Sequence, residues 1–487
     1  MNPSIDRKDP PAAPDQAASS AASTAASTAA STAFSSLPLP ESTLANLTRL
    51  GYLAMTPVQA ASLPLALAGH DLTVQAKTGS GKTAAFALAL LHKLDVRSFD
   101  VQALVLCPTR ELADQVTQEL RRLARAEDHT KVLTLCGGTP IKPQAESLAH
   151  GAHVVVGTPG RIMDHLQRGS LNLATLNTLV LDEADRMLDM GFYDDIAEVA
   201  AQCPAQRQTL LFSATYPEGI GKLSARFMRQ PKDVTLTEAP PKHQIKQLFF
   251  EVREDQRLHA VSQLLNHYRP ASTLAFCNTK QQCRDLVAVL QGQGFVALEL
   301  HGELEQRERD QVMVQFANGS ASILVATDIA ARGLDISDLA AVINVDITPD
   351  PATHTHRIGR TGRVDAQGWA FSLASLDEMG RIGQIEHQLG FTSTWQPLDT
   401  MTPSSDQPLR PARRTLQILG GRKDKIRPGD VLGALTKDLG FASAQIGKIN
   451  VNEFSTYLAV DADIADAVMK KLQGGKVKGR SVKLRAL

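Results

Sequence analysis

The chain has 487 residues, enough for about three domains at roughly 150 residues each. Hydrophobic residues make up 43% of it and charged residues 21%, which supplies ample apolar material for buried cores. Its five cysteines form no CxxC pair, so we expect neither a disulfide framework nor a structural zinc site, and a reducing, cytoplasmic location. No apolar run reaches the length of about 18 residues that a membrane span needs. We therefore expect neither a transmembrane nor a secreted protein.

The charge is balanced overall but unevenly distributed. Lys plus Arg and Asp plus Glu each total 51, yet residues 411–487 carry 15 basic and 7 acidic side chains, a local net charge of +8. A small basic segment on a mildly acidic body indicates a polyanionic partner. The alternative interpretation is an ordinary solvated basic surface.

Residues 1–33 are rich in Ala, Ser, Thr and Pro, and Ile5 is their one large branched aliphatic side chain. We predict a disordered leader here, with an alanine-rich helix as the alternative.

From residue 34 onward, short apolar runs alternate with segments of helical length, which is typical of parallel sheets covered on both faces. The first series of predicted strands is Asp71–Val74, Ala103–Leu106, His153–Val156, Thr178–Leu181 and Thr209–Phe212. The second series begins near residue 246 and includes Leu274–Phe276, Val296–Leu298, Ile323–Val325 and Val342–Val345. We therefore predict an α/β domain over 34–237, a proline-bearing linker over 238–245 and a second α/β domain over 246–395.

A second linker, 396–412, leads to a predicted small α+β domain over 413–487. Its expected elements are a strand at 416–419, a helix at 429–439, strands at 446–451 and 455–460, a helix at 464–472 and a strand at 481–484. This β-α-β-β-α-β order is that of RNA-recognition (RRM-like) folds. The first strand has no aromatic residue and the third offers only Phe454 and Tyr457, beside the acidic Glu453. The pattern disfavours base stacking on the sheet and favours RNA contacts from the basic loops.

A phosphate-binding loop follows the first predicted strand. It consists of Ala76, Lys77, Thr78, Gly79, Ser80, Gly81, Lys82 and Thr83, and a helical segment comes next. Small residues let backbone N–H groups surround phosphate oxygens, and the helix N-terminus adds its positive end. Lys82 is expected to reach the β- and γ-phosphates and Thr83 to bind Mg²⁺. The first residue is Ala76 where the strict pattern has glycine; a simple glycine-rich turn is the alternative.

Acidic residues Asp182, Glu183 and Asp185 follow the strand Thr178–Leu181. The carboxyl ends of parallel strands border the ligand crevice of open α/β sheets. We predict that Asp182 holds Mg²⁺ through water and that Glu183 polarises the water that attacks the γ-phosphate. An acidic helix N-terminus is the alternative.

The second series has no phosphate loop but contains the arginine-rich segment His356–Arg363. Arginines supplied from another domain can neutralise charge in the phosphoryl-transfer transition state. We therefore predict that ATP binds in a cleft between the two domains and that the domains close around it. A solvated basic turn is the alternative.

Together, Ala76–Thr83, the D-E-A-D run at 182–185, Ser213-Ala214-Thr215 and His356–Arg363 resemble, in order and spacing, the DEAD-box RNA helicases. The resemblance covers roughly residues 34–395 and implies two tandem RecA-like domains. It implies that Gln59 reads adenine, that Phe34 stacks on the base, that Asp335 binds the ribose and that Arg360 and Arg363 are arginine fingers. For Phe34, a core position is the alternative. Asp185, Ser213, Thr215 and His356 would couple the nucleotide cleft to RNA. His354 departs from the family, which often has an aromatic residue there.

The resemblance also implies RNA contacts from both domains. The implied residues are Pro108, Thr109, Arg110, Gly138, Thr158 and Arg161 in the first, and Asn278, Gln306, Arg309 and Thr327 in the second. Their hydroxyl, backbone and guanidinium donors suit phosphates and sugars rather than base edges. We expect RNA binding that is nearly blind to sequence, with local strand separation implied by the resemblance.

The C-terminal segment resembles the RNA-binding domain of DEAD-box helicases of the bacterial DbpA type. That resemblance implies targeting to a hairpin of 23S ribosomal RNA and action on pre-50S particles in large-subunit assembly. The expected contacts are Arg422, Lys423, Lys425, Arg427, Lys476, Lys478 and Arg480. We thus predict an ATP-dependent RNA helicase that requires Mg²⁺, is monomeric, and needs neither a membrane nor an obligate protein partner. Alternatives are a generic RNA chaperone, an ATP-gated RNA clamp and a DNA helicase of the same superfamily.

Overall fold

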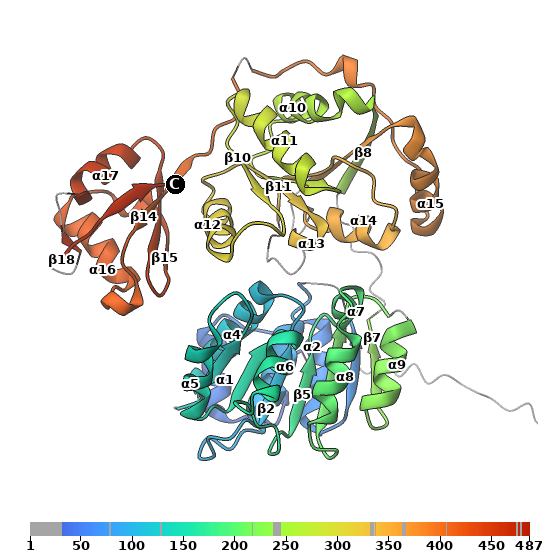
Figure 1. Cartoon of the computed structure of the whole chain (residues 1–487), viewed down its shortest axis with the longest axis vertical. Coiled ribbons are helices and arrows are strands. Elements are labelled where there is room, and N and C mark those ends of the chain that lie inside the picture. The colour runs from blue at the N-terminus through green and yellow to red at the C-terminus, as the bar shows by residue number, and fades with distance from the viewer. Residues whose placement is uncertain are drawn as a thin grey trace, which may run out of the picture.

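The computed structural model has three lobes (Figure 1). It describes residues 32–76, 79–126, 129–216, 218–236, 245–331, 336, 338–362, 367–405, 407–473, 476–477 and 480–487. We call residues 32–236 the first lobe, 245–405 the second and 407–487 the third. The predicted leader 1–33 and linker 238–245 lie almost wholly outside the described residues.

The first lobe is a parallel sheet with strand order β3-β4-β2-β5-β6-β1-β7. Its strands are β1 (Leu72–Gln75), β2 (Ala103–Leu106), β3 (Val132–Leu135), β4 (Val154–Gly157), β5 (Thr178–Leu181), β6 (Gln208–Ser213) and β7 (Lys232–Thr235). Its helices are α1 (Glu41–Arg49), α2 (Pro57–Leu67), α3 (Lys82–His92), α4 (Arg110–Leu123), α5 (Ile141–Ala149), α6 (Pro159–Gln167), α7 (Ala184–Asp189), α8 (Tyr193–Ala201) and α9 (Glu218–Phe227). Short 3-10 turns occupy Phe34–Ser36 and Ala124–Ala126.

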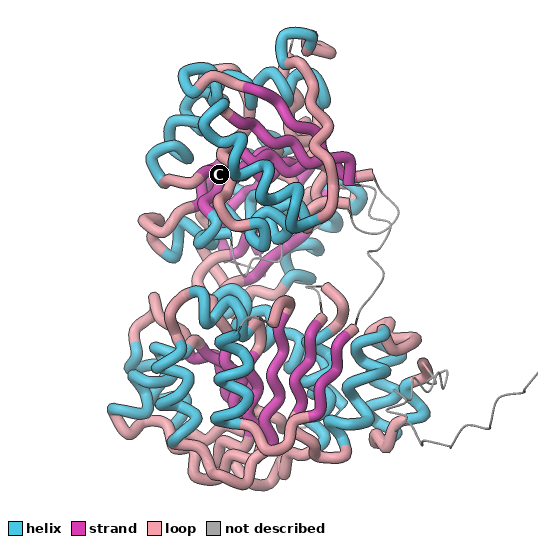
Figure 2. The backbone as a smooth tube through the Cα atoms, turned by 90° about the vertical axis from the view of Figure 1, so that its right-hand side faces the viewer, coloured by secondary structure: helices cyan, strands magenta, loops and turns pink. Residues whose placement is uncertain are grey.

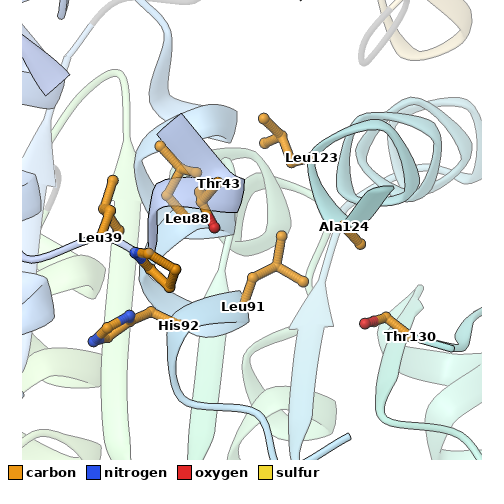
Figure 3. A pocket seen from close by; sticks show the side chains of 9 residues that line it. Leu39, Thr43, Leu88, Leu91, His92, Leu123, Ala124 and Thr130 are labelled. Carbon is orange, nitrogen blue, oxygen red and sulfur yellow. The ribbon is translucent and has the colours of Figure 1, made fainter. Parts of the chain in front are cut away.

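Successive side chains of these strands enter two hydrophobic cores, one on each face of the sheet. Val105 packs with α2, α3 and α4, whereas its neighbours Leu104 and Leu106 pack with α6, α8 and α9. Both faces of the sheet are therefore buried against helices, which explains why the sequences of its strands are nearly continuously apolar. A cavity of about 20 Å³ lies at the rim of the first core, between Leu39, Leu88, Leu91 and Leu123 (Figure 3). It is no larger than a water site and none of the predicted nucleotide or RNA residues lines it.

The second lobe repeats this design with strand order β10-β11-β9-β12-β13-β8, all parallel. Its strands are β8 (Ile245–Glu251), β9 (Thr273–Cys277), β10 (Ala297–Leu300), β11 (Ile323–Thr327), β12 (Ala341–Asn344) and β13 (Gly368–Ala374). Its helices are α10 (Arg257–Tyr268), α11 (Lys280–Gly292), α12 (Gln306–Ala317), α13 (Asp328–Ala331), α14 (Pro351–Ile358) and α15 (Met379–Leu389), with 3-10 turns at Glu254–Gln256, Leu376–Glu378 and Leu398–Thr400. Figure 2 shows the two sheets stacked one above the other, and Figure 1 shows the C-terminal lobe beside the second lobe.

The third lobe is an antiparallel sheet of order β15-β16-β14-β19. Its elements are β14 (Arg413–Ile418), α16 (Pro428–Gly433), a π-helical turn (Ala434–Asp438), β15 (Ile446–Val451), β16 (Thr456–Asp461), α17 (Ala465–Gln473), β17 (Lys476–Val477), β18 (Arg480–Ser481) and β19 (Leu484–Ala486), with 3-10 turns at Arg422–Asp424 and Ser443–Gln445. The predicted fold class and the β-α-β-β-α-β order are confirmed. Three predicted elements of this lobe had bounds wrong by three residues or more at one end. The first strand, expected over 416–419, spans Arg413–Ile418. The helix expected over 429–439 leaves α-geometry after Gly433, and the last strand begins at Leu484 because the β17–β18 hairpin precedes it.

Candidate nucleotide cleft and RNA interface

The loop after β1 turns through two glycines with positive φ, Gly79 (82°) and Gly81 (95°). A β-carbon at Gly81 would lie 2.6 Å from the amide nitrogen of Gln59, so this position requires glycine. α3 starts at Lys82, whose ammonium group donates to the carbonyl of Ala76 at 2.8 Å. Ser80 and Thr83 lie beside this turn, half-buried; Lys77 and Thr78 lie outside the described residues. The turn therefore presents the first N–H groups of a helix and a lysine, as phosphate binding requires.

Gln59 joins α2 to this loop. Its side-chain oxygen accepts from the backbone N–H of Thr56 at 2.9 Å, and its side-chain nitrogen donates to the carbonyl of Gly81 at 3.1 Å. Phe34 is 5% exposed and meets Tyr52 edge-on at 6.3 Å between ring centroids. Adenine recognition by Gln59 and stacking by Phe34 stay predictions; in this structure Phe34 occupies the alternative position, in the core.

Two buried carboxylates stand at the end of β5. Asp182 is 3% exposed and Glu183 5% exposed, and Glu183 holds a left-handed backbone (φ 52°, ψ 50°). Burial raises the pKa of Asp182 above its ordinary value, the charge of Lys82 opposes this rise, and the charge of Glu183 adds to it. A divalent cation would offset the free-energy cost of burying the charged Asp182 carboxylate. Mg²⁺ is usually bound by one or two protein oxygen ligands together with the phosphates of the substrate. The Asp182 carboxylate and the Thr83 hydroxyl therefore fit that ion.

Arg186, one turn along α7, forms a buried ion pair with Glu183 at 2.7 Å between Nη1 and Oε2. Their side chains are 5% and 7% exposed. The sequence analysis missed Arg186, although its spacing of three residues from Glu183 on a helix start was the signal that could have found it.

Asp185 connects β5 to β6. Its Oδ2 accepts from the backbone N–H groups of Ala214 (3.1 Å) and Thr215 (2.8 Å) and from the Thr215 hydroxyl (2.9 Å). The Ser213 hydroxyl donates to the carbonyl of Thr215 at 2.6 Å. Burial alone would raise the pKa of Asp185, but the hydrogen bonds from Thr215 hold it below the ordinary value. The structure thus joins three of the four predicted coupling residues directly.

The two lobes meet at a small cavity of about 20 Å³, which Arg186 lines from the first lobe and His356 and Arg360 line from the second. Burial and the charge of Arg186 lower the pKa of His356. Arg360 is 7% exposed. Arg363 and Asp335 lie outside the described residues. The structure therefore brings Arg360, a predicted arginine finger, to the same cavity as Arg186, the residue that forms the ion pair with Glu183.

Arg357 is a second residue that the sequence analysis left without a role. It is 1% exposed and donates to both carboxylate oxygens of Asp328, each at 2.7 Å. It also donates to Asn278 at 3.2 Å and to the carbonyl of Asp346 at 2.7 Å. Asn278 and the neighbour of Asp328, Thr327, are predicted RNA contacts. Arg357 therefore holds the loops after β9 and β11 to α14.

His354, on the same helix, gives a testable pH dependence. It is 1% exposed and its ring lies 6.4 Å from that of Phe249. Burial, with a smaller effect of Arg357, lowers the pKa of His354 to about 4. Because the unfolded state binds this proton near pH 6.5, we expect the second lobe to lose about 3 kcal/mol of unfolding free energy between pH 6.5 and 4. Chemical denaturation at several pH values measures this loss.

His354→Phe should remove this part of the pH dependence, since phenylalanine cannot bind the proton and fits beside Phe249. His387→Phe, at an exposed histidine of α15, is the control and should leave the slope unchanged. An unchanged slope in His354→Phe would contradict the assignment.

In the first lobe the predicted RNA residues cluster beyond the ends of β2, β3 and β4. Thr109 caps α4 by accepting from the N–H of Leu112 at 3.3 Å. The Arg110 guanidinium lies against Gly138, where a β-carbon would come within 1.8 Å of it. Arg161 donates to the carbonyl of Thr139 at 3.0 Å. Pro108 is buried directly before Thr109, and Thr158 is the N-cap residue of α6.

The predicted RNA contacts of the two lobes also bond across the gap between them. Arg110 donates to the side-chain oxygen of Gln306 at 2.8 Å, and Arg309 pairs with Glu111 at 3.0 Å. Both second-lobe residues lie on α12. The structure thus places Arg110, Gly138, Gln306 and Arg309 at one shared surface.

In the third lobe, Arg422, Lys423, Lys425 and Arg427 are exposed on one loop. Lys423 pairs with Glu453 at 2.9 Å, and its ammonium lies 4.3 Å from the ring centroid of Phe454, which is 64% exposed. Tyr457, in contrast, is 3% exposed. Lys478 and the side chains of Lys476 and Arg480 lie outside the described part of the chain.

Comparison with known proteins identifies the family. Residues 56–223 match the DEAD/DEAH box helicase model, 256–365 the helicase conserved C-terminal domain and 415–486 the DbpA RNA-binding domain. ATP-dependent RNA helicase DbpA of Escherichia coli is 53% identical over 458 residues, covering 93% of this chain and 99% of that one. The chain is a DEAD-box ATP-dependent RNA helicase.

Other relatives agree with this DEAD-box assignment. ATP-dependent RNA helicase CshA of Listeria monocytogenes is 45% identical, over 72% of this chain and 68% of that protein. The solved structure of Saccharomyces cerevisiae Dbp5 bound to RNA and ADP BeF3 has a TM-score of 0.68 and 29% identity, over 76% of this chain and 96% of that one. The DEAD-box helicase therefore uses ATP, binds RNA, and has two RecA-like lobes followed by an RNA-binding domain. Within the described residues, no helix is long and apolar enough to cross a membrane.

Proposed function

We propose that this DEAD-box helicase locally unwinds 23S ribosomal RNA during assembly of the large (50S) ribosomal subunit, guided by its third lobe to a ribosomal RNA hairpin. The observation that carries the proposal is the third lobe itself, because residues 415–486 match the DbpA RNA-binding domain. That segment lies within the part of the chain that carries a net charge of +8. Exposed Arg and Lys on one loop suit an RNA phosphate backbone. The buried free cysteines support a reducing, cytoplasmic location, and we expect a monomer.

In the proposed hydrolysis step, the loop after β1 and Lys82 hold the ATP phosphates. Asp182 and Thr83 would hold Mg²⁺, which would neutralise phosphate charge. Glu183 orients and deprotonates the attacking water, and Arg186 fixes the Glu183 carboxylate. Arg360 and Arg363 stabilise the charge that develops on the γ-phosphate when the lobes close. Gln59 and Phe34 would recognise adenine, and Asp335 the ribose.

RNA would bind across both lobes through phosphate and sugar contacts. The proposed contacts in the first lobe are Pro108, Thr109, Arg110, Gly138, Thr158 and Arg161, and in the second lobe Asn278, Gln306, Arg309 and Thr327. When the two lobes close, their RNA contacts would fit a single strand but not an A-form duplex. The base pairs of a bound duplex would therefore open locally. Asp185, Ser213, Thr215 and His356 would transmit this closure to the nucleotide.

The test replaces Arg422, Lys423, Lys425 and Arg427 together by Gln. We expect affinity for a 23S ribosomal RNA hairpin fragment to fall by about 10³-fold, because each lost phosphate contact weakens counterion release. Stimulation of ATP hydrolysis by poly(A) should stay. The matched control replaces the exposed Arg253, Lys280 and Arg381 and the half-buried Arg284 of the second lobe by Gln and should leave hairpin affinity unchanged.

Equal affinity for the hairpin and for generic RNA in the unmodified protein would support the alternative, a helicase or clamp without ribosomal RNA preference. Stimulation by single-stranded DNA as strong as by RNA would overturn RNA unwinding as the function.

A further inference from the structure

One end of the third lobe lies close to the first lobe. α12 bonds with both of these lobes: near its start Gln306 and Arg309 bond to α4, and in the turn after it the hydroxyl of Ser320 bonds to that of Thr415 on β14. Figure 1 shows the lower end of the third lobe, below the label of β15, pointing toward the side of the first lobe that carries α4 and α5. Groups at this end of the third lobe can therefore act together with groups of α4.

Two arginines from different lobes face each other here. Arg121, in the last turn of α4, donates from Nη2 to the carbonyl of Val132 at 2.7 Å. Arg422 donates from Nε to the carbonyl of Val451 at 3.0 Å. Partial burial lowers the pKa of Arg121, the charge of Arg422 lowers it further, and Asp114 of the same helix opposes both. The two guanidinium groups are therefore oriented by backbone carbonyls and close enough to repel each other.

An anion between these two guanidinium groups would turn their repulsion into attraction. A guanidinium group has five N–H donors, and one backbone bond uses only one of them. Its planar fork matches the oxygens of a phosphate. Because the carbonyls of Val132 and Val451 already orient the two side chains, little side-chain freedom would be lost when a phosphate binds. The arrangement thus suits a phosphate of the RNA backbone.

An exposed aromatic ring lies beside Arg422. Phe454, in the turn between β15 and β16, is 64% exposed. The N–H groups of Arg422 and Lys423 donate to the carbonyls of Asn452 and Glu453 in this turn, at 2.8 and 3.0 Å. The Lys423 ammonium lies 4.3 Å from the ring centroid of Phe454, so it covers one face of the ring and leaves the other open. Aromatic rings beside cationic groups are what proteins use to bind single-stranded RNA without regard to sequence.

We propose that Arg121, Arg422 and Phe454 form a subsite for a short single-stranded RNA segment between the first and third lobes, apart from the strand path at Arg110 and Gln306. Phosphates lie between the two arginines and a base stacks on the open face of the phenyl ring. The inference rests on the proposed function, because an RNA hairpin on the loop of residues 422–427 delivers its single-stranded extension to this place. Phosphates and ring faces carry no base identity, so the sequence of the extension should not matter.

RNA in this subsite links its own binding to the arrangement of the lobes. The extension binds best when Arg121 faces Arg422, and in that arrangement Arg110 also bonds to Gln306. By linkage, whatever factor the extension adds to closure of the lobes, closure adds to the affinity for the extension. A hairpin with an extension should therefore stimulate ATP hydrolysis at a lower RNA concentration than a bare hairpin does.

The first experiment measures, by fluorescence anisotropy, the affinity of the full chain for a 23S ribosomal RNA hairpin fragment, bare or with a single-stranded extension of about six nucleotides on its 5′ or its 3′ side. The extension should tighten binding by about tenfold. Arg121→Gln and Phe454→Ala should each lose most of this gain, and Arg121→Gln should lower the salt-dependence slope by about 1. Arg121→Gln should bind the bare hairpin normally, and Arg121→Lys should keep part of the gain because it keeps the charge.

The matched control is Arg226→Gln, at an exposed arginine on α9 of the first lobe, which should keep the whole gain. If the hairpin is preferred over generic RNA but an extension on either side adds nothing, or if Arg121→Gln keeps the gain, the subsite is overturned and the proposed function stands. If the unmodified protein shows no hairpin preference, the proposed function is contradicted and the subsite falls with it.

The second experiment locates the RNA without changing any proposed contact. Iron–EDTA is attached to a cysteine introduced as Gln118→Cys, an exposed position one turn before Arg121 on the same face of α4; the five native cysteines are buried. Hydroxyl radicals should cut the extension and spare the hairpin stem. The same reagent at Ala225→Cys, exposed on α9, should cut neither. Cleavage of the stem alone, or no cleavage from Gln118→Cys, overturns the proposal.

Discussion

Glu183→Gln should lower the turnover number for RNA-stimulated ATP hydrolysis by about 10²–10⁴-fold, the usual contribution of a positioned general base. Glutamine keeps the size of the side chain and a polar group for Arg186, which lies 2.7 Å from Glu183. It cannot take the proton of the attacking water. Because the substitution leaves the proposed phosphate contacts of Lys82 and the loop after β1 unchanged, the Michaelis constant for ATP should change far less. Steady-state kinetics at saturating RNA measure both quantities.

The matched control is Glu198→Gln, at an exposed position on α8, which should hydrolyse ATP at the unmodified rate. RNA unwinding by Glu183→Gln should fall in parallel with turnover. If that variant hydrolyses ATP normally, Glu183 is not the base and another group must activate the water.

Arg357→Met should destabilise the second lobe by about 3–5 kcal/mol, the cost of removing one partner from a buried ion pair. Methionine fills much of the volume but leaves Asp328 without the two hydrogen bonds that Arg357 donates. It also frees Asn278, so weaker RNA binding should accompany the lower stability. Urea unfolding, followed by the fluorescence of Trp369 and Trp395, both in the second lobe, measures the change.

Arg381→Met is the control for this substitution. Arg381 is 45% exposed and lies 3.6 Å from Glu378, so its ion pair is screened by water and its loss should cost less than about 1 kcal/mol. Equal destabilisation by the two variants would contradict a special role for Arg357. Arg357→Lys should rescue little, because an ammonium group cannot bond both Asp328 oxygens at once in the same plane.

The fold was predictable at most strands that are buried on both faces, although β13 was missed with six of its seven residues buried. β2, β4 and β5 are fully buried, so their sequences are almost purely apolar and their positions were recognised. β7 was missed because it lies at the sheet edge and buries only Val234 of its four residues. β3 was missed for a similar reason, since the middle two of its residues are only half-buried.

The candidate site was predictable where its chemistry lies in short contiguous motifs. The phosphate loop and the carboxylates after β5 each follow one strand, so sequence order alone placed them at one sheet edge. Arg357 was missed because its role depends on Asp328, a partner that only the folded backbone brings to it. Arg186 was missed although it lies three residues from its partner Glu183 in the sequence. The hydrogen bonds of Thr415 with Asn318 and Ser320 could not be predicted, since no local pattern links β14 to the turn after α12.

The backbone at Glu183 has a consequence for engineering this helicase. A left-handed conformation at a residue other than glycine costs roughly 1–2 kcal/mol, and Glu183 adopts it at φ 52°. Glu183→Gly would relieve this backbone cost, but it would leave the buried Arg186 without its carboxylate partner, at a cost of about 3–5 kcal/mol. A screen for thermal tolerance should therefore retain Glu183, because its ion pair with Arg186 outweighs the strain of the left-handed backbone.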